Sequence, residues 1–265
     1  VVMEGAYESV YTATWHYVEG VGGEGFGMRV KEGHPPQLWT DDEVMKGSVE
    51  DDIDNEKPED GRLELMVLTS EKGWPCTGFS MNKSCDIYVN KEVMRVWYKI
   101  LKNLDEYFGK RVDAIEELTP YVLVGTPGIG KSFAAGSFLL YQLLRYDAKK
   151  LPVVAYFIRG GAYLFEKKSD GGKVTWYKNE EKAVSVAQDF FNQGKENKEK
   201  RGYIIYDVDD KSKGAPRALP PSGWGMTVIS SPNEEQYKEW EKQKVAECIV
   251  MNCPTVREIK AICAW

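Results

Sequence analysis

The sequence lacks an excess of positive charge and any long apolar run. Its 265 residues carry 35 Lys and Arg against 41 Asp and Glu, a net charge of -6. This balance disfavours a protein that coats DNA or lies on anionic lipid, although it leaves direct nucleic-acid binding at a local site open. No apolar run approaches the roughly 20 residues that span a bilayer, and the first residues have no basic and apolar segments typical of a secretory signal. We therefore expect no membrane partner.

Residues that bind transition metals are also scarce. The chain has only two histidines, His16 and His34, and its five cysteines form no C-x-x-C pair. Zinc sites need closely spaced pairs of such ligands, so the sequence gives no sign of one. Unpaired cysteines are typical of a reducing compartment, which favours an intracellular protein.

Acidic residues are concentrated near the N-terminus. Residues 41–60 contain ten acidic side chains against two lysines, a local charge of -8. Such a run is typical of a solvated loop rather than a helix or strand. We expect it to interrupt a smaller α+β region over residues 1–88.

Hydrophobic spacing predicts the elements of that region. Apolar residues recur at helical spacing over residues 7–18, which predicts an amphipathic helix, and the glycines of residues 20–27 end the pattern. Residues 63–69 and 87–89 are rich in aliphatic residues and predict strands.

From residue 89 onward, helical and strand patterns alternate. This alternation predicts an α/β domain with a parallel sheet over residues 89–265. The expected helices cover residues 90–109, 131–146, 180–192, 234–244 and 256 onward, and the expected strands cover 121–124, 153–158, 203–207, 226–230 and 248–251. Residues 162–166 and 173–177 flank an Asp-Gly-Gly turn and predict an inserted β-hairpin. Because the chain starts without methionine and stops inside a helical pattern, we expect a fragment.

One motif carries specific chemistry. The pattern G-x-x-x-x-G-K-[ST] is matched in full by Gly125, Thr126, Pro127, Gly128, Ile129, Gly130, Lys131 and Ser132. An apolar strand pattern precedes it and a helical pattern follows it, which is the context of a phosphate-binding loop. Glycines let the backbone N–H groups surround phosphate oxygens at a helix N-terminus. Lys131 would reach the β- and γ-phosphates of ATP, and the Ser132 hydroxyl would bind Mg²⁺.

A nucleotide site also needs a carboxylate for the metal. Asp207 ends the apolar strand pattern of residues 203–207, so we expect it to hold Mg²⁺, through a water molecule. A carboxylate that orients water is expected next, but Val208 stands there. Asp209 is the candidate for this catalytic role and Asp210 could also take it, but both are equally consistent with solvated turn residues before the basic segment at 211–213.

Three further assignments stay open at this point. Ser230 and Ser231 end the next strand pattern and could sense the terminal phosphate, but Ser231 could instead begin a capping box with Glu234. An arginine could stabilise charge on that phosphate, and the candidates in this chain are Arg159, Arg201 and Arg217. An arginine of a neighbouring subunit is a further alternative. A GTPase is disfavoured because the segment after Asp207 lacks the D-x-x-G glycine.

Several stretches resemble the retrotransposon hot spot protein family of trypanosomes over nearly the whole chain. They are VMEGAY at 2–7, LELMVLTSEKGWP at 63–75, EVMRVWY at 92–98, GTPGIGKS at 125–132 with GSFLLY at 136–141, VVAYF at 153–157 and SSP at 230–232. The resemblance implies a family-specific N-terminal region joined to a P-loop ATPase-like domain, and a nuclear or perinuclear protein.

The order of elements also looks like that of additional-strand ATPases of the AAA-like kind, whose helical lid follows the last strand. Here the chain ends about one helix after that strand, so we expect truncation before the lid. We therefore expect a Mg-ATP-binding P-loop protein that is a slow ATPase or a nucleotide-dependent switch with protein partners, which could include a second copy. The alternatives are a non-catalytic scaffold of chromatin or transcription complexes and, more weakly, a small-molecule kinase.

Overall fold

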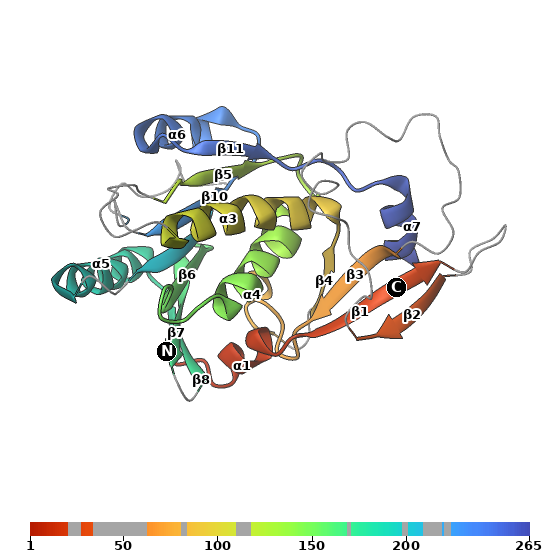
Figure 1. Cartoon of the computed structure of the whole chain (residues 1–265), viewed down its shortest axis with the longest axis horizontal. Helices are drawn as coiled ribbons and strands as arrows, with labels where there is room; N and C mark the ends of the chain where they lie inside the picture. Colours follow the sequence, from red (N-terminus) through yellow and green to blue (C-terminus); the bar gives the residue numbers. More distant parts are fainter. Residues whose placement is uncertain are drawn as a thin grey trace.

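The computed structural model describes residues 1–20, 28–33, 63–80, 84–109, 118–168, 171–197, 201–208, 219 and 224–265. It contains a large sheet and a small sheet, with helices packed on both (Figure 1). The predicted acidic loop at 41–60 and the glycine-rich segment at 21–27 lie outside the described residues.

The large sheet confirms the predicted parallel α/β architecture. Its seven strands run in the order β11, β5, β10, β9, β6, β7 and β8. The first five are mutually parallel: β11 (Glu247–Val250), β5 (Tyr121–Val124), β10 (Gly225–Ile229), β9 (Gly202–Asp207) and β6 (Val153–Ile158). The predicted hairpin is also confirmed, as β7 (Gly161–Lys168) and β8 (Gly171–Tyr177) continue the sheet in antiparallel pairing.

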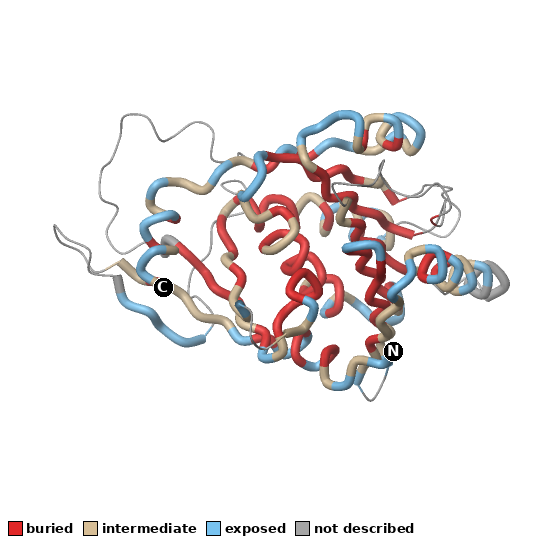
Figure 2. Tube along the Cα trace, turned by 180° about the vertical axis from the view of Figure 1, so that it is seen from behind, coloured by how far each residue is buried: buried red, intermediate tan, exposed pale blue. Residues whose placement is uncertain are grey.

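Helices cover both faces of this sheet because its central strands are apolar on both sides. In β5, Tyr121 and Leu123 join one buried cluster while Val122 and Val124 join another. The first face is covered by α3 (Lys91–Gly109) and α4 (Ser137–Arg145), and the second by α5 (Glu180–Asn197) and α6 (Lys238–Lys244). In Figure 2 the buried segments, drawn in red, lie in the interior of the molecule, and the exposed ones lie on its outer helices and ends.

The small sheet is antiparallel and stands beside the large one. Its strands run in the order β2 (Met28–Glu32), β1 (Thr14–Gly20), β3 (Leu63–Thr69) and β4 (Asp86–Val89). The strand predictions for residues 63–69 and 87–89 are therefore confirmed. The last helix, α7 (Val256–Ala264), packs on this sheet through Ala261, which belongs to one buried cluster with Val18, Leu65 and Val67.

The predicted helix over residues 7–18 is wrong in its second half. The chain forms a short helix, α1 (Ala6–Tyr11), and then enters β1 at Thr14. Residues 14–18 are Thr-Trp-His-Tyr-Val, all aromatic, β-branched or imidazole side chains that fit a pleated sheet better than a helix. Pairing with β2 and β3 on both sides then fixes this segment as a central strand.

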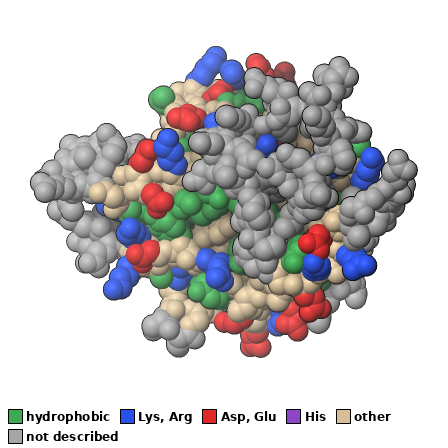
Figure 3. Space-filling model, turned by 45° about the vertical axis from the view of Figure 1, so that its right-hand side comes forward, with side chains coloured by type: hydrophobic (Ala, Val, Ile, Leu, Met, Phe, Trp, Pro, Cys, Tyr) green, Lys and Arg blue, Asp and Glu red, His purple; other side chains and the backbone are tan. Residues whose placement is uncertain are grey.

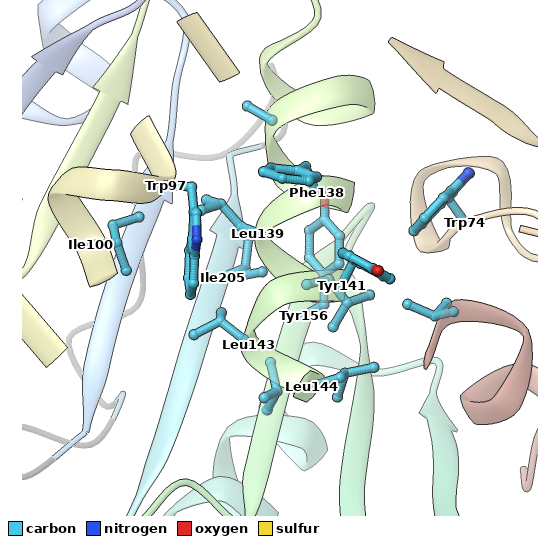
Figure 4. Close-up of a cluster of buried hydrophobic side chains, with 14 of the residues drawn as sticks. Trp74, Trp97, Ile100, Phe138, Leu139, Tyr141, Leu143, Leu144, Tyr156 and Ile205 are labelled. Atoms are coloured by element: carbon cyan, nitrogen blue, oxygen red, sulfur yellow. The ribbon is translucent and has the colours of Figure 1, made fainter. Parts of the chain in front are cut away.

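The two parts of the chain share one hydrophobic core. Trp74, just before the short 3₁₀ turn η1 (Pro75–Thr77), belongs to the same buried cluster as Trp97 of α3 and Phe138 of α4. Figure 4 shows Trp97 and Trp74 on opposite sides of α4, which carries Phe138. The predicted division at residue 88 stays a prediction, because α3, which follows it, packs into this shared core.

Charges of both signs are mixed over the face shown in Figure 3, around a group of hydrophobic side chains. Within the described ranges, no helix combines the length and the apolarity of a membrane span.

Candidate functional site

The candidate site lies where parallel strands of the large sheet end together. Backbone hydrogen bonds continue the pairing just past three strand ends: the Ser230 N–H donates to Leu123, the Val208 N–H to Ile229 and the Met251 N–H to Val124, at 2.8–3.0 Å. Carboxyl ends of parallel strands meet at one edge, where open α/β sheets bind their ligands. Asp207, Ser230 and the phosphate loop are therefore held at the same edge.

The loop after β5 has the backbone that the glycine motif requires. Gly128 and Gly130 have φ of +85° and +94°, values that side chains with a Cβ rarely adopt. At Gly125 the reason is space, because a Cβ there would come within 2.6 Å of Ile129 Cδ1 and 2.8 Å of the Met251 carbonyl oxygen. The end of β11 thus closes against the start of the loop.

The helix after the loop does not begin as a regular α-helix. Residues Lys131–Gly136 form a π-helical segment, η2, which continues into α4. The Gly130 carbonyl oxygen accepts from the N–H groups of both Ala134 and Ala135, at 2.7 and 3.0 Å. π-helical turns are rare and are frequent at functional sites. The predicted helix at 131–146 is confirmed in place, with this wider first turn.

Lys131 lies folded into the loop. Its side-chain ammonium donates to the carbonyl oxygens of Gly125 at 2.6 Å and Thr126 at 3.0 Å, and the residue is 9% exposed. Burial lowers the pKa of Lys131 by disfavouring its charged form, and the nearby Asp207 carboxylate partly opposes that effect. The site therefore holds a partly desolvated cation, which an anionic ligand would stabilise.

Ser132 and Asp207 meet although 75 positions separate them in the chain. The Ser132 hydroxyl donates to Asp207 Oδ1 at 3.0 Å. The hydroxyl and the carboxylate are both oxygen ligands of the kind that Mg²⁺ prefers, and they lie beside the phosphate loop. Among the described residues no group of three or more His, Cys, Asp or Glu side chains could hold a metal. A metal here would thus complete its shell with water or ligand oxygens, as Mg²⁺ usually does.

The predicted phosphate sensors differ in their surroundings. Ser230 is 2% exposed, and its hydroxyl has no hydrogen-bond partner among the described residues. The Ser231 hydroxyl donates to Gln236 Oε1 at 2.6 Å. The predicted capping box at Ser231 is wrong: Asn233 is the N-cap of the 3₁₀ turn η3 (Glu234–Gln236), because its side-chain oxygen accepts from the Glu235 N–H. Asp209 and Asp210 lie outside the described residues.

Three residues outside the phosphate-loop motif also shape the site, and sequence patterns missed two of them, Tyr156 and Cys76. The buried Tyr156 of β6 donates from its hydroxyl to the Ser132 carbonyl oxygen at 3.1 Å. Gly136 lets that ring approach the helix, because a Cβ there would lie 2.5 Å from the Tyr156 hydroxyl. Cys76, from the N-terminal region, contacts the Ser137 hydroxyl at 3.5 Å. Only Gly136 gave a signal in the sequence, as a small residue in a helix that packs on a sheet.

All five cysteines are free thiols. Burial raises the pKa of Cys76, while a hydrogen bond with Ser137 opposes the rise. A buried thiol with a raised pKa is a structural residue rather than a reactive one.

Comparison with known families gives two matches that together cover most of the chain. Residues 7–119 match the family described as "Retrotransposon hot spot proteins N-terminal", and residues 122–265 match "Retrotransposon hot spot protein, P-loop domain". Searches of curated proteins and of solved structures found no significant match. The second family match begins inside β5 and includes the whole glycine loop, Asp207 and Ser230. The chain therefore belongs to the retrotransposon hot spot protein family, and residues 122–265 form its P-loop domain.

Proposed function

We propose that this chain binds Mg-ATP at the carboxyl edge of its large sheet and acts as a slow ATPase or nucleotide-dependent switch. The contact between Ser132 and Asp207 carries the proposal, because it places a hydroxyl and a carboxylate together beside the phosphate loop. A turn that served only to join β5 to a helix would not need this pair.

Each part of the site would take one part of the ligand. The loop N–H groups and the Lys131 ammonium would bind phosphate oxygens, which are stronger acceptors than the two carbonyl groups that Lys131 now contacts. Ser132 and Asp207 would hold Mg²⁺, the Asp through water. The metal would neutralise charge on the phosphates when bound. The unpartnered Ser230 hydroxyl, buried at the same edge, would respond to the terminal phosphate.

The strand order supports the additional-strand, AAA-like class. β10 lies between β5, which leads into the loop, and β9, which ends at Asp207. In the ATPases that this order resembles, an extra strand separates the same two elements. Such proteins use nucleotide state to control assembly, and we propose protein partners, including a second copy, in nuclear complexes.

Thermal unfolding with and without Mg-ATP tests nucleotide binding. A ligand that binds only the folded state at about 100 times its Kd stabilises it by about 2.7 kcal/mol, an increase in Tm on the order of 5 to 10 °C for a chain of this size. We expect the increase in the wild type and in Lys182→Ala, a control on the exposed surface of α5, but not in Lys131→Ala. Equal increases in wild type and Lys131→Ala would refute the assigned site.

Hydrolysis needs a separate measurement, because Val208 stands where a carboxylate that orients water is expected. Its backbone N–H continues the sheet pairing by donating to Ile229. This feature favours the second candidate function, a scaffold that keeps the fold without catalysis. Phosphate release that stops in Asp207→Asn would exclude the scaffold. Binding without release would favour it, and phosphate transfer to another small molecule would indicate a kinase.

A further inference from the structure

The turn between β6 and β7 places an arginine in an unusual backbone conformation. Arg159 and Gly160 form this two-residue connection, with φ of +52° and +70°. Two-residue hairpins favour such values at both positions, but the first position then favours Asn, Asp or Gly. A long side chain in the left-handed region is strained. The backbone conformation at this position therefore does not favour arginine, and a reason for arginine here has to lie in its side chain.

This turn lies at the same sheet edge as the phosphate loop. β6 pairs with β9, with Phe157 opposite Tyr206, so Arg159 follows its strand end beside Asp207. The charges of Asp207 and Arg159 both act on two buried groups, Tyr156 and Cys76. Burial is the main cause that raises the pKa of each group. The negative charge of Asp207 adds to each rise, and the positive charge of Arg159 opposes it. Arg159 and Asp207 therefore both lie near the same two buried groups, at the edge where their adjacent strands end.

The other candidate arginines are placed differently. Arg201 precedes β9, at the opposite end of that strand from Asp207, and its guanidinium lies over the rings of Tyr107 and Phe108, 4.9 and 5.5 Å from their centroids. Arg217 lies outside the described residues. Arg159 is exposed, and in the described part of the chain its guanidinium has no hydrogen-bond or ion-pair partner. Of the arginines that the structure describes at or near the sheet, Arg159 is the one available at the site edge.

We propose that Arg159 binds the terminal phosphate of the nucleotide and makes the site prefer a triphosphate over a diphosphate. This inference rests on the proposed nucleotide site. A guanidinium offers paired N–H donors that match phosphate oxygens. Arg159 follows the end of β6, which lies beyond β9 as seen from β5. Its guanidinium would therefore approach the terminal phosphate from the side opposite the loop. The α- and β-phosphates stay with the loop and Lys131.

The test compares the affinities for Mg-ATP and Mg-ADP, measured by titration calorimetry, in wild type, Arg159→Gly and Val245→Gly. Val245 is the matched control: it also has φ of +52°, but it is 82% exposed after α6 and precedes the opposite end of β11. Glycine relieves backbone strain at both positions, so neither variant should unfold more easily than wild type. Arg159→Gly should lose about 10- to 100-fold in ATP affinity and less than about twofold in ADP affinity. Val245→Gly should keep both affinities.

The outcomes distinguish the role of Arg159 from the proposed nucleotide binding on which it rests. If wild type binds neither nucleotide, the proposed function fails, and the role of Arg159 fails with it. If wild type binds ATP and Arg159→Gly keeps the wild-type ratio of ATP to ADP affinity, only the role of Arg159 is overturned. An equal loss for both nucleotides would also overturn it. Arg159→Lys, which keeps the charge but not the paired donors, should recover part of the ATP preference.

Discussion

The hydroxyl of Tyr156 donates a hydrogen bond to the carbonyl oxygen of Ser132 at 3.1 Å, joining the middle of β6 to the first turn after the phosphate loop. The ring is fully buried, so it cannot turn away without repacking the core. The same Ser132 contacts Asp207 with its side chain. Tyr156 therefore fixes the backbone of the residue whose hydroxyl would bind the metal.

Tyr156→Phe should weaken the metal dependence of nucleotide binding. We expect both Tyr156→Phe and the control Tyr203→Phe to lose about 1 to 2 kcal/mol in the free energy of unfolding, because each removes the hydrogen bond of a buried tyrosine hydroxyl. Tyr203 is also nearly fully buried, but its hydroxyl bonds to Thr227, away from the loop. Only Tyr156→Phe should reduce the ratio of ATP affinity in Mg²⁺ to that in EDTA. An unchanged ratio in both variants would remove the positioning role.

The alternating part of the fold could be predicted from sequence because each element has its own hydrophobic period. The predicted strand over residues 153–158 has the bounds of β6, and the turn residues near Gly171 indicated the hairpin. The segment at 14–18 misled because its apolar residues also fit helical spacing from residue 7. The segment forms a strand because it pairs with β3, about 50 residues later in the chain. The spacing of neighbouring residues cannot reveal so distant a partner.

The candidate site was predictable only where one continuous motif encodes it. The loop and Lys131 follow from eight consecutive residues, and Asp207 follows from its place at a strand end. Tyr156 and Cys76 carry no such signal, since buried tyrosines and cysteines are common in cores. Their contacts depend on how β6 and the N-terminal region pack against η2 and α4, which only the folded chain reveals.

Gly136→Ala should destabilise the fold although alanine is the better helix former. The new Cβ would lie 2.5 Å from the Tyr156 hydroxyl and 3.0 Å from Ile229 Cδ1, and overpacking of this kind costs about 1 to 3 kcal/mol. In Gly109→Ala, at the end of α3, the Cβ would meet nothing within 4 Å. Urea unfolding should show the loss only in Gly136→Ala. Combining that variant with Tyr156→Phe should cost less than the sum of the two, and strict additivity would refute the clash.

Lys167 should make stability rise with pH above neutrality. Its ammonium donates to the carbonyl oxygens of Leu143 and Tyr146 at the end of α4, and burial lowers its pKa from 10.5 to about 7. Between these values the unfolded chain binds a proton that the folded chain has released, so the free energy of unfolding rises with pH by at most about 1.4 kcal/mol per unit. Urea unfolding from pH 7 to 9 should show a smaller rise in Lys167→Met than in wild type. Parallel slopes would mean that Lys167 keeps its usual pKa.

A buried ion pair joins the start of α3 to the end of β11. Arg95 donates to Glu92 at 2.7 Å and to the Val250 carbonyl oxygen at 2.5 Å, and Glu92 also accepts from the Asn252 N–H at 2.9 Å. Burial raises the pKa of Glu92, but the hydrogen bonds from Arg95 and Asn252 together lower it by more, so the net shift of the pKa is downward. The carboxylate is thus charged at neutral pH and depends on its partners.

Breaking this pair from one side should cost more than removing both charges. Arg95→Met leaves the Glu92 carboxylate, 1% exposed, without its cation, and should lower the free energy of unfolding by about 3 to 5 kcal/mol. Glu92→Gln with Arg95→Met should recover part of this loss, because a neutral amide needs no cation. Denaturant unfolding of wild type and both variants measures the difference. A double variant no more stable than Arg95→Met would show that the cost lies in lost packing and in the Val250 contact, rather than in the unpaired charge.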